Sequence, residues 1–335
     1  MKPIIVGDDI RKYEINYRDR YLIWTFIGID IEKYPAIKKY LESFKEELEK
    51  RWDKGNYYYE LRACDYYDLF EKPKIIYPDI AKESRMTLDR DGLFLTNTAY
   101  FIPSQDLYLL SLLNSKLIFN YYKRTATVLG DADKGGRMRW FSQDIVRLPI
   151  RRISFTTPAP ERARLGAELQ ELYEASSFDQ ILKIVDACLP KDPAGGFAPG
   201  EKSDVVHDLL AFLAEQMLQM NAKKQKEIRG FLGWLEGYVG ARVDDLSPKT
   251  KVQSYYEHDY DDLLAVLKKN RKKLQIDPAR REPGEMLRAE FEGSVGKLQP
   301  LRERITATDR LIDAVVYRLY GLSEEEIGIV EGHAK

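Results

Sequence analysis

Cysteine, histidine and long apolar runs are scarce in this chain of 335 residues, and each shortage excludes a class of protein. The two cysteines, Cys64 and Cys188, lie far apart, and there are only three histidines. These residues lack the spacing of a zinc site, and two cysteines are too few for a disulfide framework. No apolar run approaches the ~18 residues of a membrane-spanning helix, and the start of the chain does not resemble a signal peptide. We expect a cytoplasmic protein.

An excess of one charge is also missing, because the formal net charge is −1 at pH 7. The balance by itself indicates neither a nucleic-acid nor a membrane partner, so the distribution matters more than the sum. Residues 1–153 contain 27 basic and 23 acidic residues, whereas residues 154–335 contain 26 and 31. Residues 116–152 hold nine basic and three acidic residues, and they are the only stretch that we identify as a basic patch.

Motifs for cofactors and nucleophiles are missing as well. The chain has no GxGxxG or GxxxxGK[ST] loop for phosphates and no GxSxG elbow. Residues 77–84, YPDIAKES, begin like the Pro-Asp motif of metal-dependent nucleases. No acidic-x-Lys pair on a following strand completes that motif, although several carboxylates must converge on such a metal. We therefore predict no catalytic residue, no cofactor site and no metal site in this chain.

The chain changes character near residue 155. Before it, β-forming runs at residues 21–28, 74–80 and 92–103 alternate with helical patterns at residues 34–52 and 107–125. Beyond Pro158 and Pro160 almost everything has helical periodicity, interrupted by a Pro- and Gly-rich linker at residues 191–203. We predict an α+β fold, with a mixed α/β domain over residues 1–155 and an all-helical region over residues 156–335. The helical region would pack on the first domain or on a catalytic partner.

Several residues mark the expected ends of helices in the second half. Asp277-Pro278 and Ser323, followed three residues later by Glu326, are typical N-cap patterns, and the latter fits a capping box. Gly321 is a typical C-cap. The apolar face of the last long helix is expected at Leu311, Ile312, Val315, Val316, Leu319 and Tyr320.

What the first half does contain is a mixture of aromatic and basic residues. Residues 56–80 include six tyrosines, and residues 129–152 place Arg137, Arg139 and Trp140 beside the glycines at 135 and 136. A Gly-Gly turn lets the backbone approach a partner closely, and arginines beside it can contact phosphates or guanine edges. The alternative is that the tyrosines are half-buried core and the arginines a solvated face, and composition alone favours that alternative.

Four segments follow one another in the order and spacing of the TaqI-like C-terminal specificity domain: residues 61–80, 92–103, 108–117 and 134–150. The opening VGDDIRKY, residues 6–13, resembles the segment with which such domains begin. The resemblance implies the target-recognition part of adenine-N6 DNA methyltransferases and of fused type II restriction-modification enzymes. Residues 205–236 and 308–327 are similar to the C-terminal tails of the larger fused enzymes.

Enzymes of this family also carry a methyltransferase module, which binds S-adenosylmethionine through a Gly-rich loop and holds the flipped adenine with an Asn/Asp-Pro-Pro-Tyr motif. Neither motif occurs here. The resemblance therefore implies a recognition part alone, either a separate subunit or a fragment, with no cofactor of its own. Its partners would be double-stranded DNA and a methyltransferase module or subunit, with a nuclease as a further candidate.

The resulting hypothesis is a sequence-specific, double-stranded DNA-binding module that directs a methyltransferase or nuclease. Two alternatives stay open: a protein-binding scaffold subunit with weak or no DNA contact, and a self-sufficient enzyme whose catalytic residues escape recognition. In the opening segment, Asp8 would cap the loop rather than touch a base. The residues predicted to contact DNA are Lys134, Arg137 and Arg139, then Arg62, Lys74 and Arg85, and Tyr13 of the opening segment that begins at Gly7.

Overall fold

The computed structural model describes residues 1–129, 136–192 and 198–332. The chain divides into two units: Met1–Phe155 together with Leu322–Lys335 form the first, and Thr156–Gly321 form the second. Among the described residues, every strand lies in the first unit, and the second unit is helical. The predicted α+β class with a helical C-terminal region is confirmed.

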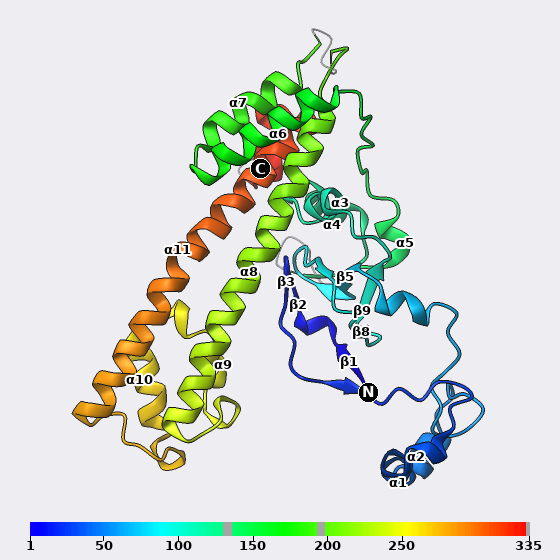
Figure 1. Ribbon diagram of the computed structural model, residues 1–335, viewed down its shortest axis with the longest axis vertical. Helices are drawn as coiled ribbons and strands as arrows, with labels where there is room; N and C mark the ends of the chain where they lie inside the picture. Colours follow the sequence, from blue (N-terminus) through cyan, green and yellow to red (C-terminus); the bar gives the residue numbers. More distant parts are fainter. Residues whose placement is uncertain (130–135, 193–197, 333–335) are drawn as a thin grey trace. The chain divides into compact units, whose positions relative to one another are not determined.

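The strands of the first unit form small sheets (Figure 1). The strand β5 (Lys74–Pro78) lies between β7 (Thr87–Asp89) and β9 (Ala99–Ile102), antiparallel to both. A second sheet places β1 (Lys2–Ile5) between β4 (Tyr21–Leu22) and β8 (Phe94–Leu95). The third sheet has the order β10 (Val128–Leu129), β11 (Arg137–Arg139), β6 (Ile80–Ala81), and β2 (Ile10–Arg11) pairs with β3 (Glu14–Ile15).

Two of the predicted strands are each divided between two sheets. Residues 74–80 form β5 and then β6, with Asp79 between them. The N–H of Asp79 donates to the carbonyl of Thr98 at 2.8 Å in the register of the β5–β9 pair, whereas its carbonyl accepts the N–H of Trp140, next to β11, at 2.7 Å. Residues 92–103 form β8 and β9, separated by a turn in which the hydroxyls of Thr96 and Thr98 lie 2.8 Å apart. These breaks bring the ends of several strands to one place.

The third predicted strand, residues 21–28, is regular only at β4. Beyond it, the Trp24 ring packs edge-on against Tyr67 at 4.6 Å and against Phe94 at 4.9 Å between ring centroids. Aromatic packing of this kind buries a large apolar area without a hydrogen-bonded ladder. The apolar run therefore contributes to the core of the first unit as irregular chain.

The predicted helices of the first unit are each broken once. Residues 34–52 form α1 (Pro35–Glu42) and α2 (Lys45–Glu49). Residues 107–125 form α3 (Leu107–Leu113) and α4 (Lys116–Thr125), because Ser115 accepts the N–H of Ile118 and caps a new helix. Short helices α5 (Ser142–Ile145) and α12 (Glu324–Val330) complete this unit, and α12 begins with the predicted capping box of Ser323 and Glu326.

The second unit is built on two long helices that lie side by side, α8 (Ser203–Val239) and α11 (Arg281–Leu319) (Figure 1). Helices α6 (Ala159–Glu174) and α7 (Phe178–Cys188) pack against α8. Helix α9 (Lys249–Gln253) packs on α10 (Tyr260–Lys269), which contacts α11. The predicted apolar face of α11 is buried from Leu311 to Leu319, and Gly321 has the left-handed φ of 69° expected after a helix.

One predicted helix start is wrong. Helix α11 begins at Arg281 with Arg280 as its N-cap, three residues after Asp277. The Asp277 carboxylate instead accepts the N–H of Ala279 at 3.2 Å and pairs with Arg271 at 2.9 Å. Asp277 is thus part of a short turn before α11 and does not cap the helix, although the sequence had suggested a cap there.

The predicted linker at residues 191–203 is partly described. Residues 193–197 lie outside the described residues, and α8 begins at Ser203. Just before it, the N–H of Lys202 donates to the carbonyl of Cys188 at 2.7 Å, and its ammonium pairs with Glu161 at 2.7 Å. Within the described part of the chain, none of the helices combines the length and apolar character needed to cross a membrane.

Candidate nucleic-acid interface

A groove of about 510 Å³ in the first unit is lined by segments that lie far apart in the sequence. Its walls come from residues 6–8, residues 79–82, Arg85, Thr98 and Arg137. The opening segment and three of the four segments that follow it in the TaqI-like pattern contribute, the exception being residues 108–117. The groove is therefore where the fold brings the sequence motifs together.

Gly7 holds the opening segment against the turn before β9. Its N–H donates to Thr98 Oγ1 at 2.9 Å, and a Cβ at this position would lie 2.4 Å from the Thr98 carbonyl oxygen. Since the obstacle is backbone, only glycine permits this approach. The same carbonyl accepts the N–H of Asp79 at 2.8 Å. Thr98 thus joins three walls of the groove.

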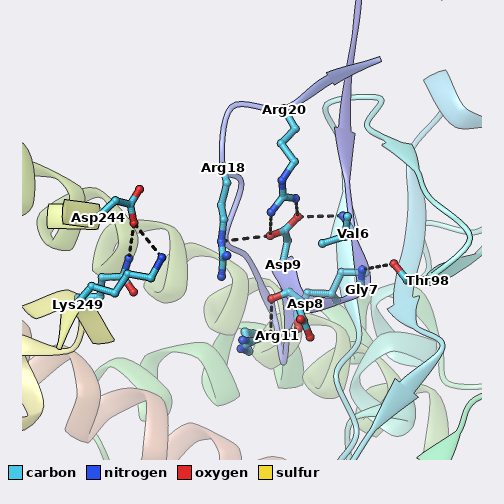
Figure 2. A network of polar contacts seen from close by, with 12 residues as sticks. Val6, Gly7, Asp8, Asp9, Arg11, Arg18, Arg20, Thr98, Asp244 and Lys249 are labelled. Atoms are coloured by element: carbon cyan, nitrogen blue, oxygen red, sulfur yellow. Dashed lines mark hydrogen bonds and ion pairs between the residues drawn. The ribbon is translucent and has the colours of Figure 1, made fainter. Parts of the chain in front are cut away.

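The opening segment is fixed by Asp9 rather than by Asp8 (Figure 2). Asp9 is fully buried, accepts the N–H of Val6 at 2.9 Å, and pairs with Arg20 and with Arg18 at 3.5 Å. A carboxylate held by two guanidinium groups and an N–H is a strong clamp on a loop. The prediction that Asp8 caps this loop is wrong, because Asp8 is exposed and lines the groove.

Three cations line the groove: Lys82, Arg85 and Arg137. Lys82 and Arg137 are exposed, whereas Arg85 is half-buried and its Nε donates to a Glu83 oxygen at 2.9 Å. The lining also includes two carboxylates, those of Asp8 and Asp79. Asp79 is already paired with an arginine, as described below. The surface is consequently cationic on balance and accessible to an anion.

Arg11 adds positive charge beside the groove. Its Nη1 donates to the carbonyls of Asp8 at 2.8 Å and Ile10 at 2.9 Å (Figure 2). Burial lowers the pKa of Arg11, and the nearby charge of Arg85 lowers it further. An arginine remains protonated despite such a shift. Arg11 and Arg85 thus repel one another, and a bound polyanion would relieve that repulsion.

Arg137 and Arg139 lie two residues apart on β11, with the buried Met138 between them. Arg137 lines the groove, whereas Arg139 pairs with Asp79, with Nη2–Oδ2 at 2.9 Å and Nε–Oδ1 at 3.4 Å. The Arg139 guanidinium also lies 4.5 Å from the centroid of the Phe141 ring. Asp79, which lies 60 residues earlier in the chain, is thus a carboxylate that Arg139 pairs with.

Two of the predicted DNA contacts are buried, and the structure contradicts them. The Lys74 side chain has no exposed surface, since its ammonium pairs with the buried Asp89 and donates to the carbonyl of Phe70 at 2.5 Å. Tyr13 is 1% exposed and belongs to the core, and its N–H donates to the carbonyl of Met86 at 2.9 Å. Neither side chain reaches the surface where DNA would bind.

The other predicted residues have mixed outcomes. Arg62 is exposed, but it is not among the residues that line the groove. Lys134 lies outside the described residues. Of the arginines and lysines named from the sequence, the groove brings together Arg85 and Arg137.

Sequence reasoning missed two residues of the groove, Lys82 and Thr98. Lys82 lies three residues after Asp79 and is the kind of exposed cation that could have been found there. Thr98 carries no such signal, because its role comes from one backbone carbonyl and one hydroxyl that join Gly7 and Asp79. A residue of that kind becomes visible only once the strands are placed.

The described residues hold no cluster of three or more His, Cys, Asp or Glu side chains suited to a metal. Asp79 of the nuclease-like Pro-Asp dipeptide is engaged by Arg139. Cys64 and Cys188 are both free, and burial raises the pKa of the Cys188 thiol. A thiol with a raised pKa is a poor nucleophile near neutral pH.

Comparison with known proteins finds two family matches, one in each of the two units. Residues 2–150 match the TaqI-like C-terminal specificity domain, and residues 203–316 match a family described as a domain of unknown function, DUF8810. A curated type II methyltransferase of Pseudomonas aeruginosa is 26% identical over 196 residues. That similarity covers 56% of this chain and 31% of the methyltransferase. This chain is therefore similar to about a third of the length of that relative.

Proposed function

Residues 2–150 form a TaqI-like C-terminal specificity domain, and on this basis we propose that the chain recognises double-stranded DNA by sequence within a type II restriction-modification system. The groove between the opening segment and β11 would meet the duplex. A methyltransferase module, acting at adenine N6, would carry out the chemistry, with an endonuclease as a further partner. The complex would act in the cytoplasm, where its DNA is found.

The groove is the observation that supports this proposal best. Lys82 and Arg137 are exposed and Arg85 is half-buried, and all three line one concave surface built from the family motifs. Phosphate contacts from such cations fix the register of a protein on DNA, and an arginine can also bind guanine in the major groove through two hydrogen bonds. Arg137, the first residue of the central strand β11 of a short sheet, is the residue that we propose for base contact.

The rigidity of the groove also favours recognition. Gly7, Thr98 and Asp79 are joined by backbone hydrogen bonds, and Asp9 clamps the opening segment from behind. Recognition residues on a preorganised scaffold lose less conformational entropy on binding than those on a free loop. Arg139, through its pair with Asp79, would position the strand that carries Arg137 instead of contacting a base itself.

We further propose that S-adenosylmethionine binds to the methyltransferase module and not to this chain. The support is the lack of a Gly-rich phosphate loop and of a Pro-Pro-Tyr element in the sequence. Isothermal titration of the chain with S-adenosylmethionine should therefore give no binding heat. Stoichiometric binding would contradict the division of roles.

The alternative, a scaffold subunit that binds protein, has one observation in its favour. Aromatic side chains around α1 and α2 are exposed, with Trp52 98% and Tyr57 59% exposed. Exposed aromatics of this size are typical of protein-binding surfaces. A scaffold without DNA contact would show no salt-dependent affinity for duplex DNA, whereas a DNA-binding module would.

Selection from a randomised duplex library tests the proposal directly. The chain is incubated with the library, bound duplexes are amplified, and the rounds are repeated with competing unrelated DNA. The proposal predicts enrichment of one short sequence that is bound at least ~10³-fold more tightly than unrelated duplex. Enrichment of no sequence, at salt concentrations where the chain does bind DNA, would contradict sequence recognition.

A further inference from the structure

The helical unit has a basic surface of its own, between α10 and α11. Residues 268–281 contain seven basic residues and one acidic residue. The rest of residues 154–335 contains 19 basic and 30 acidic residues. Positive charge is thus concentrated in one short segment of an otherwise acidic half, so residues 116–152 are not the only basic patch of the chain. The seven residues, all exposed, are named here the α10–α11 basic cluster: Lys268, Lys269, Arg271, Lys272, Lys273, Arg280 and Arg281.

Carboxylates on the neighbouring elements neutralise only part of the cluster. Two of them pair with its members: Asp277 lies 2.9 Å from Arg271, and Glu285 lies 2.9 Å from Arg281. Glu282 and Asp245 form no ion pair with any described residue. Three further carboxylates, on α10 and on the 3-10 turn before α9, are held by cations from outside the cluster. The pairs, with their N–O distances, are Asp262 with Lys251 at 2.6 Å, Asp244 with Lys249 at 3.4 Å and Asp261 with Arg288 at 3.7 Å.

Four members of the cluster consequently have no ion-pair partner within the described part of the chain. The side chains of Lys268, Lys269, Lys272 and Arg280 make no hydrogen bond or ion pair with any described residue. All four are exposed. Like charges held together at a surface repel one another, and a bound anion of extended shape would reduce this repulsion. The cluster therefore favours the binding of such an anion.

The segment that carries these cations is fixed rather than loose. Asn270 is 6% exposed, and its side chain bonds both the N–H and the carbonyl of Ser247, at 3.1 and 2.9 Å. The N–H of Gln275 donates to the carbonyl of Val239 at 2.9 Å, and Leu274 and Ile276 pack on the core of this end of the unit. Four free cations therefore project from a backbone that is already ordered.

We propose that the α10–α11 basic cluster binds the phosphate backbone of duplex DNA without selecting its sequence, a role that rests on the proposed function because that function supplies the duplex. Among the described residues of segment 268–281, no large hydrophobic side chain is exposed. Protein interfaces have an apolar centre and are depleted in lysine, so this surface does not suit an acidic protein. A duplex offers one negative charge per ~1.7 Å of its axis, which matches a dense row of lysines and arginines.

The size of the effect follows from counterion release. Each phosphate that a cation neutralises on B-DNA contributes about 0.9 to the slope of log affinity against log salt concentration. Four unpaired cations would therefore contribute a slope of roughly 3–4, which the chain would lose if all four were replaced. The loss should be the same on every sequence, since phosphates carry no sequence information.

Fluorescence anisotropy with the full chain and two labelled duplexes, one selected and one unrelated, tests this role. The variant replaces Lys268, Lys269, Lys272 and Arg280 with Gln. The charge-matched control makes the same replacement at four exposed lysines on or near α7 and α8, namely Lys183, Lys191, Lys223 and Lys226. A third variant, with Lys268, Lys269 and Lys272 changed to Arg, keeps the charge. Circular dichroism and thermal melts show that each variant is folded.

We expect the cluster variant to lose affinity for both duplexes by the same factor, with a slope shallower by roughly 3–4, while the control and the arginine variant change little. An unchanged slope in a chain that still prefers its selected duplex would refute the role of the cluster and leave sequence recognition standing. A third outcome is that the cluster variant no longer binds unrelated DNA, while the wild-type chain shows no preference for the selected duplex. That result would support the role of the cluster and refute sequence recognition. Failure of the wild-type chain to bind either duplex would refute both.

Discussion

Arg139 and Asp79 form an ion pair between β11 and the residue that precedes β6, with Arg139 Nη2 2.9 Å from Asp79 Oδ2. The carbonyl of Asp79 also accepts the N–H of Trp140 at 2.7 Å. Side chain and backbone of one aspartate thus hold the strand that carries Arg137. An aspartate that resembles a nuclease residue in the sequence acts in this structure as an anchor for a recognition strand.

Arg137 is predicted to act on DNA and not on stability. It is exposed, so Arg137→Ala should change the free energy of unfolding by less than ~0.5 kcal/mol. If Arg137 contacts a base, binding to the selected duplex weakens by ~1–3 kcal/mol and preference relaxes at one position; if it contacts phosphate, all sequences are affected alike. Competition binding with single-base variants of the duplex distinguishes the two. Lys39→Ala on α1, an exposed cation away from the groove lining, is the control, and equal effects of both changes would remove Arg137 from the interface.

Gly7 is predicted to be intolerant of any side chain. A Cβ at this position would lie 2.4 Å from the Thr98 carbonyl oxygen, so Gly7→Ala must displace backbone and should cost about 1–3 kcal/mol in the free energy of unfolding. Gly166→Ala on α6 is the control, because its Cβ would meet no atom within 4 Å. Alanine there should be neutral or stabilising by up to ~1 kcal/mol. Urea denaturation measures both, and equal stabilities would show that the approach of Gly7 to Thr98 is not tight.

Lys74 is predicted to act on stability and not on DNA. Its side chain and that of Asp89 have no exposed surface, so Lys74→Met leaves a buried carboxylate without its cation and should cost about 3–5 kcal/mol. Lys72→Met, two residues earlier and exposed, should change stability by less than ~0.5 kcal/mol. Urea denaturation provides the comparison. A stable Lys74→Met variant that has lost DNA affinity would restore the original prediction that Lys74 contacts DNA.

The second unit is predicted to lose stability in acid through Asp204. Burial alone would raise the pKa of Asp204, but hydrogen bonds from the Thr157 hydroxyl at 2.6 Å and N–H at 2.8 Å outweigh it and lower the pKa. A carboxylate with a lowered folded pKa stabilises the fold above its ordinary pKa of 3.8, and this contribution is lost as the pH falls through the folded value. Thr157→Val should therefore flatten the decline of stability below that pH, whereas Thr306→Val on the exposed side of α11 should not. Urea denaturation between neutral and acid pH measures the slope, and identical slopes in the wild type and Thr157→Val would contradict this assignment.

The sequence predicted the elements of this fold better than their ends. Hydrophobic periodicity located β5, α3 with α4 and the buried face of α11, because burial patterns repeat over many residues. Hydrophobic periodicity missed the break in the strand at Asp79 and the break in the helix at Ser115. Each break depends on the hydrogen bonds of a single residue and not on a repeating pattern. At Asp79 the N–H bonds a carbonyl 19 residues further along the chain and the carbonyl bonds the N–H of Trp140, two partners that no local pattern specifies.

The residues of the candidate site were also predicted only in part from the sequence. The resemblance to a specificity domain singled out Gly7 and Arg137, because their segments carry recognisable motifs, and both residues line the groove. Charge alone misplaced Lys74, since a lysine within an apolar strand looks the same in sequence whether it faces solvent or a buried aspartate. The densest group of basic residues was also overlooked. The α10–α11 basic cluster lies outside the segments that resemble the specificity domain, so no motif drew attention to it.

The central claim is that the groove of the first unit binds DNA, and the salt dependence of binding by groove variants tests it most directly. The variant replaces Lys82, Arg85 and Arg137 with Gln, and the control replaces Lys39, Lys50 and Lys72, which are exposed and do not line the groove. The account predicts that the groove variant loses preference for the selected duplex and that its slope of log affinity against log salt becomes shallower by roughly 2–3, while the control keeps both. Preference and slope that stay at wild-type values in the folded groove variant would contradict the account.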